Sequence, residues 1–430
     1  MRTQNVYQLP NVAEFKTQLL AWAQQFHTIV WLDSNNYQQQ YTNYDAVLAV
    51  EEFTSIKTDY QNAFEQLKEY KNTTKDWIFG YLTYDLKNDV EQLESKNNDE
   101  LEFPELFFFQ PQKLFLIKGN TVEVQYLRMV DDEIESDFKT ILNFNLSEIT
   151  SVNESPKIKL RLAKEDYFKN INKVLSHIHR GDIYEANYCQ EFYAENVTLQ
   201  PLQVYQKLNA ISNPPFASFF KHNTHYMLSA SPERYIKKEG NKIISQPIKG
   251  TAKRDNNPKI DTQLKNDLAN DIKERSENVM IVDLVRNDLS LTASKGSVKV
   301  EELCKVYSFD QVHQMISTVT SQVKPNIDAV DVIKTTFPMG SMTGAPKISA
   351  MHIIEDLEIT KRGLYSGSLG YFTPDNDFDF NVIIRSILYN QAKNYVSYSV
   401  GGAITAKSDP TKEYEECLLK AKAMREALMS

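Results

Sequence analysis

The chain has 430 residues, a formal net charge of −9, and 24% charged residues. This negative balance argues against an electrostatic grip on nucleic acid or on an anionic membrane surface, because both need a basic face. The length exceeds the size at which one hydrophobic core usually stops growing, so we expect one large two-lobed unit or two domains.

The three cysteines, Cys189, Cys304 and Cys417, have no metal-type spacing and are odd in number. A disulfide framework is therefore not expected, and a reducing compartment fits best. The N-terminal stretch lacks a basic segment followed by an apolar core, and no apolar run approaches the length of a membrane span. The sequence thus predicts a cytoplasmic protein without a signal peptide.

The polar segment 146–160 marks the expected connection between an N-terminal region, 1–150, and a C-terminal catalytic region, 151–430. Strand-like apolar runs dominate the N-terminal region, with one polar helix predicted near 58–71. These runs cover residues 28–34, 46–53, 76–86 and 105–117.

The C-terminal region opens with a predicted helix that ends at Gly181. One apolar stripe defines its buried face: Phe168, Ile171, Val174, Leu175 and Ile178. Three strands are expected next, at 225–230, 233–239 and 241–248, the last two joined through Gly240.

A long helix is then predicted over 261–287, and a second helix is expected to start near Pro346. Strands are predicted at 364–372, 380–389 and 395–405, followed by a last helix over about 411–428. The residues expected on the buried sides of the first and last of these helices are Leu264, Leu268, Ile272, Val279, Tyr414, Leu418, Ala421 and Leu428. Strand runs interrupted by helix runs favour an α+β fold with antiparallel sheets.

Two predicted helices each carry a carboxylate pair with a spacing of three, Glu274 with Glu277 and Glu413 with Glu416. This spacing places both members of a pair on one helix face. Such pairs either lie on solvated faces or hold Mg²⁺, which takes oxygen ligands, keeps waters and often completes its shell with an anionic substrate.

Other segments have a functional and a structural interpretation. The small and hydroxylated residues of 337–351 precede a helix, where N–H groups suit an anion, or they form only a loop and cap. Gly401 and Gly402 mark either a close approach to a ligand or a bulge. Arg385, inside an apolar run, either binds a substrate carboxylate or lies on the polar face of a strand. His313, like most single histidines, has a structural alternative.

Collinear motifs between residues 165 and 425 identify the chain as resembling the chorismate-utilising enzyme family, which includes the component I chains of anthranilate and aminodeoxychorismate synthases and the isochorismate and salicylate synthases. The matching stretches are "GDIYEANYCQEF", "SASPERY", "PIKGTAKR", "ERSENVMIVDLVRNDLS", "SFDQVHQMISTV", "FPMGSMTGAPKISAM", "YSGSLGYF", "NVIIRSI" and "DPTKEYEECLLKAKA". The resemblance implies two antiparallel β-sheets packed as a sandwich, with helices on the outside. It is thinner in the N-terminal region.

Lys249 decides the subtype, because anthranilate synthases resemble "PIAGT" here, whereas aminodeoxychorismate synthases resemble "PIKGT". The resemblance implies that the Lys249 amine adds at C2 of chorismate, that the C4 hydroxyl departs, and that ammonia then adds at C4 and expels the lysine. An ordinary lysine amine, with a pKa near ~10.4, is protonated at neutral pH, so burial or a nearby cation is expected to lower its pKa. A solvent-facing turn lysine is the alternative.

The resemblance assigns the remaining roles by position. Glu233 would serve as the base, Glu274 as the general acid at the departing hydroxyl, and Glu277 with Glu416 as ligands of Mg²⁺, with Glu413 close by. His313 would lie beside the reacting ring. The residues implied to bind chorismate are Ser341, Thr343, Gly344, Tyr365, Arg385, Gly401, Gly402 and Ala403.

Two positions depart from the family pattern. Glu185 stands where the aminating members usually have Gln, and its carboxylate either helps to deprotonate ammonia or Lys249 or is paired elsewhere and inert. Ala403 stands where a third glycine is common, although alanine still offers its N–H. Ser34 resembles a serine of the pocket in which some members hold tryptophan, so this pocket either binds tryptophan, is structural, or is empty.

The leading hypothesis is the Mg²⁺-dependent conversion of chorismate to 4-amino-4-deoxychorismate for folate synthesis. Its ammonia would come from a separate glutaminase subunit, because no amidotransferase segment with a nucleophilic cysteine is found in the chain. The enzyme alternative is anthranilate synthase component I. The alternative of another class is a catalytically silent scaffold that binds a glutaminase partner or an effector.

Overall fold

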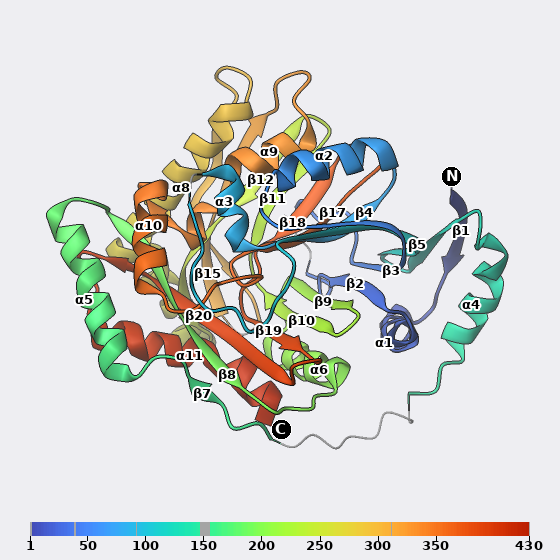
Figure 1. Ribbon diagram of the computed structural model, residues 1–430, viewed down its shortest axis with the longest axis horizontal. Coiled ribbons are helices and arrows are strands. Elements are labelled where there is room, and N and C mark those ends of the chain that lie inside the picture. Colours follow the sequence, from blue (N-terminus) through green and yellow to red (C-terminus); the bar gives the residue numbers. More distant parts are fainter. Residues whose placement is uncertain (1, 38–39, 92, 147–154, 311, 430) are drawn as a thin grey trace.

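The fold was obtained as a computed structural model that describes residues 2–37, 40–91, 93–146, 155–310 and 312–429. Twenty strands are joined through antiparallel pairings into one continuous hydrogen-bonded sheet network, and helices pack around it (Figure 1). The predicted α+β class is therefore confirmed. Within these ranges, none of the helices is long and apolar enough to span a membrane.

The N-terminal region contains both helices and strands. Its main elements are β1 (Arg2–Gln8), α1 (Val12–Trp22), β2 (Thr28–Asp33), β3 (Ala46–Thr58), α2 (Ala63–Thr74), β4 (Ile78–Leu82), α3 (Lys87–Val90), β5 (Leu106–Lys118), β6 (Thr121–Leu127) and α4 (Ile134–Leu142). The predicted strands and the predicted helix are all present. The helices α1 and α4, and the strands β1 and β6, were not predicted.

The C-terminal region supplies most of the elements near the candidate site. They are β7 (Lys159–Leu160), α5 (Lys164–Arg180), β8 (Glu185–Ala194), α6 (Pro201–Ser212), β9 (Phe216–His222), β10 (His225–Ser231), β11 (Arg234–Glu239), β12 (Lys242–Gln246), β13 (Ile248–Lys253), α7 (Pro258–Asn270), α8 (Ile272–Thr292), β14 (Lys299–Ser308), β15 (Val312–Gln322), α9 (Ala329–Thr336), β16 (Gly344–Ala345), α10 (Lys347–Leu357), β17 (Ser368–Phe372), β18 (Phe378–Asn381), β19 (Ser386–Asn390), β20 (Tyr395–Thr405) and α11 (Pro410–Met429).

Strands of the two regions pair with one another. β2 is hydrogen-bonded to β9, with Trp31 opposite Phe219, and β4 is hydrogen-bonded to β17, with Gly80 opposite Gly370. The two regions therefore share one sheet. The predicted boundary near residue 150 falls in the segment 147–154, which lies outside the described residues, and it stays a prediction.

Alternate residues of a strand point to opposite faces of the sheet. In β3 the first five residues are all buried, so both faces of the sheet are covered there. In β3, Leu48 and Val50 belong to a core that also includes residues of α1, α5, α6 and α11. Val47 and Ala49 belong to a second core with residues of α2, α8 and α9. Helices thus cover the sheet from both sides, as expected.

The helix α5 agrees with its predicted stripe in part. Ile171, Val174 and Ile178 are buried, whereas Phe168 and Leu175 are half-buried. The helix ends at Gly181, whose φ of 89° is a left-handed conformation that glycine adopts at no steric cost.

The predicted long helix over 261–287 was wrong, because α7 ends at Asn270 and α8 begins at Ile272. Asp271 separates them: its backbone is extended, and its side chain accepts a hydrogen bond from the backbone N–H of Glu274. An aspartate in this role favours a helix start over a helix interior.

The apolar residues Ile272 and Val279 of α8, which were predicted to be buried, are exposed to solvent. Ile272 is 77% exposed and Val279 is 39% exposed, while Glu277 and Asn278 are buried. In α11, Leu418 is 41% exposed and Tyr414 is half-buried. These helices turn carboxylates, not only apolar side chains, toward the protein interior, which a hydrophobic stripe cannot predict.

The predicted strand over 380–389 was also wrong as one element, because β18 ends at Asn381 and β19 begins at Ser386. The break contains Arg385, whose φ is 53°. This is a left-handed conformation that a non-glycine residue rarely adopts, and it interrupts the ladder.

Candidate active site

Lys249 lies on β13, at an irregularity in the pairing of this strand with β15. The register shifts between Ile248 and Thr251, and Gly250 has a φ of 94°. Such an extra residue re-aims a side chain out of the regular strand alternation. The Lys249 side chain is only 12% exposed, and its Nζ lies 3.0 Å from Oε1 of Glu185.

Glu185 is the first residue of β8, and its side chain is 1% exposed. Within the described part of the chain, its Oε2 has no hydrogen-bond partner. Burial acts to lower the pKa of Lys249, but the charges of Glu185 and Glu277 more than reverse this effect, so that the pKa is raised. The sequence led us to expect the opposite direction. In this state the lysine is an ammonium group paired with a buried carboxylate.

Glu233 lies in the connection between β10 and β11. It precedes Lys249 in the sequence, whereas Glu274 follows Lys249. Burial raises the pKa of Glu233 to about 7, although the Ser341 hydroxyl and the Lys249 charge partly oppose this shift. The backbone holds it from two sides: Ser231 Oγ accepts a hydrogen bond from Glu233 N, and Val382 N donates to Glu233 O. A buried carboxyl with this pKa can exchange a proton near neutral pH.

The helices α8 and α11 bring their carboxylate pairs to one place. Lys273 Nζ lies 3.7 Å from Glu277 Oε1 and 3.8 Å from Glu413 Oε1, so that one ammonium group faces carboxylates of both helices. Burial raises the pKa of Glu277 to about 7 and also raises the pKa of Glu413. The four predicted acidic residues thus form one cluster.

Glu274 and Glu416 complete this cluster. A Cβ atom added to Gly250 would lie 3.2 Å from Glu274 Oε2, which places that carboxylate beside the residue that follows Lys249. Burial raises the pKa of Glu274. Burial also acts to raise the pKa of Glu416, but the charge and hydrogen bond of Lys420 leave this pKa lowered. Of the two, Glu274 is therefore better suited to carry a proton.

The cluster can be compared with what Mg²⁺ needs. Among the described residues, no group of three or more histidine, cysteine, aspartate or glutamate side chains is arranged to hold a metal ion. Mg²⁺ is usually bound by one or two carboxylates, with waters and a substrate anion filling its other positions. Glu277 Oε1 is buried and has no hydrogen-bond partner in this part of the chain. The donor set therefore fits a two-carboxylate site.

Two glycines of β20 pack differently against their neighbours. A Cβ atom on Gly401 would lie 2.4 Å from Cys189 Sγ, so that this position has no room for a side chain. A Cβ atom on Gly402 would lie 3.4 Å from Glu413 Oε2, an ordinary contact distance. Ala403 is paired with Asn187 of β8. The glycine run is a regular strand that passes close to the carboxylate cluster.

Arg385 points its side chain toward α11, where its Nη1 donates a hydrogen bond of 3.1 Å to the backbone oxygen of Lys420. Burial lowers its pKa, while Tyr365 and Glu416 act in the opposite direction. The hydroxyl of Tyr365 is 3.7 Å from Cys189 Sγ. A half-buried guanidinium on a strained backbone, bonded to a carbonyl, suits an anionic ligand.

The segment before α10 packs tightly against β8. Gly344 is paired with Ala186, and a Cβ atom on Gly344 would lie 2.2 Å from Glu185 O. Thr343 O accepts a hydrogen bond of 2.7 Å from Asn187 N. Ser341 Oγ is buried and has no hydrogen-bond partner of ordinary geometry in the described chain. Together with Glu233, Ser341 lines a recess of about 350 Å³, a volume that includes its opening to solvent. Gly344 thus serves backbone packing, while Ser341 is open to a ligand.

His313 lies on β15, and its hydrogen-bond partners are not the carboxylates of α8 and α11. Its Nε2 is 3.0 Å from Asp261 Oδ1 of α7, and its Nδ1 is 3.0 Å from Ser308 Oγ. Both ring nitrogens therefore have protein partners. The role beside the reacting ring stays a prediction, and these contacts do not favour it. The next residue, Gln314, points to the other face of the strand, and its buried Oε1 has no hydrogen-bond partner among the described residues.

A buried ionic network behind the site was not predicted from the sequence. Arg362 donates two hydrogen bonds to Glu358, of 2.9 and 2.7 Å, and two more to Met342 O and Asn187 O, of 2.7 and 2.6 Å. It thereby fixes both the segment of Ser341 and the strand of Glu185. Its only sequence signal is the spacing of Glu358 and Arg362 by four residues, which is common on solvated surfaces.

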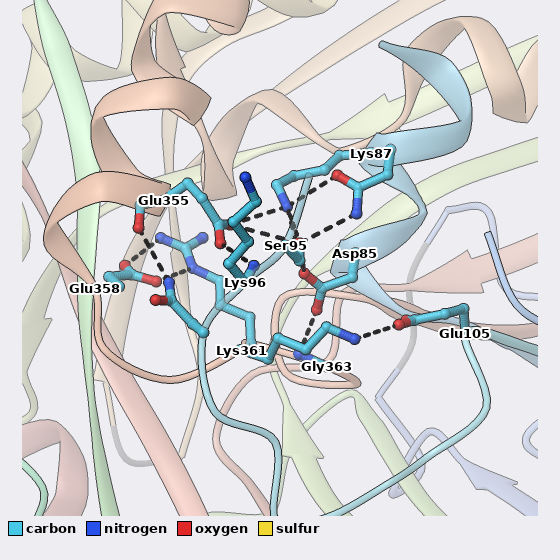
Figure 2. A network of polar contacts seen from close by, with 12 residues as sticks. Asp85, Lys87, Ser95, Lys96, Glu105, Glu355, Glu358, Lys361 and Gly363 are labelled. Atoms are coloured by element: carbon cyan, nitrogen blue, oxygen red, sulfur yellow. Dashed lines mark hydrogen bonds and ion pairs between the residues drawn. The ribbon is translucent and has the colours of Figure 1, made fainter. Parts of the chain in front are cut away.

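Figure 2 shows how this network continues into the N-terminal region. Lys361 Nζ donates to Glu105 Oε1 at 2.6 Å, and Gly363 N donates to Asp85 Oδ2 at 2.9 Å. Lys87, which is fully buried, lies 3.2 Å from Glu355 Oε2. The wall of the candidate site is therefore braced by charged groups from both regions.

A second cavity, of about 530 Å³ including its open mouth, lies where strands of the N-terminal and C-terminal regions meet. Ser34 lines it, and the Ser34 hydroxyl is buried without a hydrogen-bond partner in the described chain. Its other lining residues include Asn43, Asp45, Phe216, Arg234 and Asn381. The predicted effector position is thus found in a cavity with polar and aromatic walls.

Comparisons with known proteins show the family to which the chain belongs. The family model for chorismate binding enzymes matches residues 26–426. An anthranilate synthase component I-like protein of Synechocystis is 36% identical over 354 residues, which cover 82% of this chain and 72% of that protein. Aminodeoxychorismate synthase component 1 of Bacillus subtilis is 31% identical over 362 residues, which cover 81% and 76%.

Among solved structures, anthranilate synthase component I from Streptococcus pneumoniae matches with a TM-score of 0.77 and 24% identity, over 91% of this chain and 95% of that one. At this identity the likeness shows the fold alone. The names of the relatives divide between two chorismate-aminating activities, so the distinction between them depends on the site.

Proposed function

Since the chain belongs to the chorismate binding enzyme family and is an enzyme of that family, we propose that it aminates chorismate at C4 to give 4-amino-4-deoxychorismate. The observation that carries this proposal is the buried amine of Lys249, 3.0 Å from the Glu185 carboxylate and next to Glu233, Glu274 and Glu277. A turn lysine without a chemical role would point into solvent.

The proposed reaction starts with the loss of a proton from Lys249. The proton passes to a carboxylate, either Glu185, which touches the amine, or Glu233, whose pKa of about 7 suits a base near neutral pH. The free amine then forms a bond to C2 of chorismate. The ring double bond shifts, and the C4–O bond breaks.

Glu274 is proposed to supply the proton with which the C4 hydroxyl leaves as water. The raised pKa of Glu274 supports a protonated form, and its position beside Gly250 keeps it near Lys249. Ammonia next bonds to C4, the double bond returns, and the C2–N bond to Lys249 breaks. Chorismate and ammonia thus give 4-amino-4-deoxychorismate and water, and the lysine is regenerated.

Glu277 and Glu416 are the residues that we propose to hold Mg²⁺, with Glu413 close by. When bound, Mg²⁺ would neutralise and orient the ring carboxylate of the substrate. Arg385, Tyr365 and the backbone near Gly401 are proposed to bind the second carboxylate, since Arg385 is a half-buried cation that has only a carbonyl as its described hydrogen-bond acceptor. The two anionic groups would fix the ring over Lys249.

Ammonia is proposed to come from a separate glutaminase subunit in the cytoplasm, and the product is proposed to lead to para-aminobenzoate and folate. Ser34 and its cavity are proposed to bind tryptophan, since the unpartnered Ser34 hydroxyl can accept a hydrogen bond from an amino group. Tryptophan fluorescence of the ligand and calorimetric titration would test this binding. A purified protein that neither contains nor binds tryptophan would remove this part of the proposal.

The decisive experiment is product analysis by chromatography with chorismate, ammonium and Mg²⁺. The expected product is 4-amino-4-deoxychorismate. Without ammonium, intact-mass analysis should show a chorismate-derived adduct on the wild type and none on Lys249→Ala. Full amination activity in that variant would exclude the nucleophile role.

Anthranilate synthase component I is the second candidate, and the name of the Synechocystis relative favours it. Direct attack of ammonia at C2 would lead toward anthranilate, whose fluorescence makes it easy to detect. Fluorescent anthranilate as the main product would establish this function instead. No turnover of chorismate at saturating ammonium and Mg²⁺ would favour a catalytically silent scaffold.

A further inference from the structure

We propose that Lys273 is the counter-cation of the carboxylate cluster before a metal ion binds, and that a divalent cation displaces it. This inference rests on the proposed metal-dependent function, and it concerns a lysine to which neither the motifs nor that function gives a role.

Lys273 occupies the position between the two carboxylate-bearing helices. It is the second residue of α8, and its Nζ lies 3.7 Å from Glu277 Oε1 on the same helix and 3.8 Å from Glu413 Oε1 on α11. A bound Mg²⁺ would use oxygens of this same cluster at about 2.1 Å. The ammonium group and the metal ion therefore compete for the same negative charge.

The contacts of Lys273 are those of a replaceable ion. Both distances exceed that of a hydrogen bond, and the side chain is 41% exposed, so that it can swing into solvent. The other lysines near the cluster are anchored. Lys249 Nζ lies 3.0 Å from Glu185 Oε1, and Lys420 Nζ lies 2.6 Å from Glu416 Oε1 and donates a hydrogen bond of 2.8 Å to Gly401 O. Lys273 is therefore the lysine that would leave.

The cluster needs a cation in its metal-free state. Glu277 and Glu413 are both buried, and Glu277 Oε1 has no hydrogen-bond partner among the described residues. Buried carboxylates that lose a neighbouring cation are poorly solvated and less compensated in charge. Lys273 supplies one positive charge, and a divalent ion would supply two together with direct coordination. Its departure would also return a flexible, well-hydrated side chain to water.

The test measures divalent-ion binding without turnover. Wild type, Lys273→Met and Lys422→Met would be titrated with Mn²⁺ by calorimetry in the absence of substrate. Lys422 is a matched control because it forms an i,i+4 ion pair of the same 3.7 Å length with Glu426, farther along α11. We expect Lys273→Met to bind Mn²⁺ roughly five- to tenfold more tightly than the wild type and Lys422→Met to bind unchanged.

A second measurement is the thermal midpoint in EDTA and in saturating Mn²⁺. Lys273→Met should have a lower midpoint than the control variant in EDTA, and Mn²⁺ should remove this difference. Unchanged or weaker Mn²⁺ binding by Lys273→Met would overturn the inference and leave the proposed function intact. A loss of chorismate affinity with unchanged Mn²⁺ affinity would instead assign Lys273 to the substrate. If the wild type bound no divalent ion, the inference and the proposed metal requirement would both fall.

Discussion

The Nζ of Lys249 lies 3.0 Å from the Oε1 of Glu185, and this pair joins β13 to the first residue of β8. The pair is nearly closed to solvent and holds the lysine as an ammonium group, because the neighbouring carboxylates raise its pKa. A nucleophilic amine must be neutral, so the proposed reaction would begin with the transfer of a proton inside the pair or to Glu233. Several measurable consequences depend on this arrangement.

Glu185→Gln should shift the pH dependence of amination. The carboxylate is one of the charges that raise the pKa of Lys249, so its removal should lower that pKa and move the acid limb of the kcat/KM profile to lower pH. Glu191→Gln, on the same strand but paired with Arg161, is the control. If the Glu185 carboxylate is itself the obligatory proton acceptor, the rate will instead fall at all pH values, which would contradict a purely electrostatic role.

Glu233 should make stability depend on pH. Burial raises its pKa from 4.5 to about 7, so the folded protein binds this proton more tightly than the unfolded chain does. The contribution to stability is full below pH ~4.5 and is lost as the pH rises through about 7. Glu233→Gln removes this loss.

As the pH rises from about 5 to about 8, the wild type should therefore lose unfolding free energy relative to Glu233→Gln. The expected relative loss is roughly 3 kcal/mol at most. Thermal midpoints at the two pH values would check this shift, with Glu195→Gln, an exposed carboxylate, as the control. Parallel pH dependences of variant and wild type would show that Glu233 ionises normally.

The pair of Arg362 and Glu358 should be costly to break. Both side chains are buried, and each has hydrogen bonds to the backbone: Arg362 to Met342 and Asn187, Glu358 from Cys189. Glu358→Gln should destabilise the protein by about 3 kcal/mol or more, since it leaves a buried guanidinium without its counter-charge.

Breaking the exposed pair of Lys159 and Glu195 is the corresponding control, and Glu195→Gln should cost less than about 1 kcal/mol. Thermal or denaturant unfolding of both variants measures the difference. Equal small losses would mean that the buried network contributes little beyond filling space.

The two glycines of β20 should respond differently to alanine. In Gly401→Ala the new Cβ would meet Cys189 Sγ at 2.4 Å, so we expect a loss of roughly 1–3 kcal/mol in stability from overpacking. In Gly402→Ala the nearest atom is Glu413 Oε2 at 3.4 Å, an ordinary contact distance, so both the fold and Mn²⁺ binding should be retained. Thermal unfolding and Mn²⁺ titration of both variants test these expectations. The reverse pattern would contradict the packing described for this strand.

Glu277→Gln should weaken Mn²⁺ binding by at least roughly tenfold, equivalent to about 1.4 kcal/mol, because a neutral amide is a poorer ligand than a carboxylate. Glu415→Gln, which changes an exposed carboxylate on α11 beside the cluster, should leave it unchanged. Calorimetric titration distinguishes them. Equal affinities of the two variants would place the metal outside the predicted cluster.

The sequence was sufficient to predict the α+β class, most strands and the residues gathered around Lys249, because local patterns and short motifs encode them. Predictions from the sequence were wrong where polar side chains are buried in place of apolar ones. The prediction that Ile272 and Val279 are buried was wrong, because α8 turns Glu277 and Asn278 toward the interior instead. The prediction of one strand through Arg385 was wrong, because the pattern of apolar residues does not show that this residue has a left-handed backbone.

The network of Arg362 could not be predicted either, for a different reason. Its partners come from segments that are far apart in the chain, including Asn187, Met342 and, through the adjoining residues, Asp85 and Glu105. Sequence spacing carries no information on such contacts. His313 illustrates the limit of carrying a role over by motif, because its partners Asp261 and Ser308 are visible only in the fold.

The pairing of β4 with β17 also sets the order in which the chain can complete its fold. β4 ends at Leu82, whereas β17 begins at Ser368, so one edge of the early strand stays without its native neighbour during most of translation. Such a non-local ladder makes folding slow and exposes an apolar edge on the ribosome. A chain cut before Ser368 would therefore lack the partner of β4, so the sheet can be completed only late in synthesis.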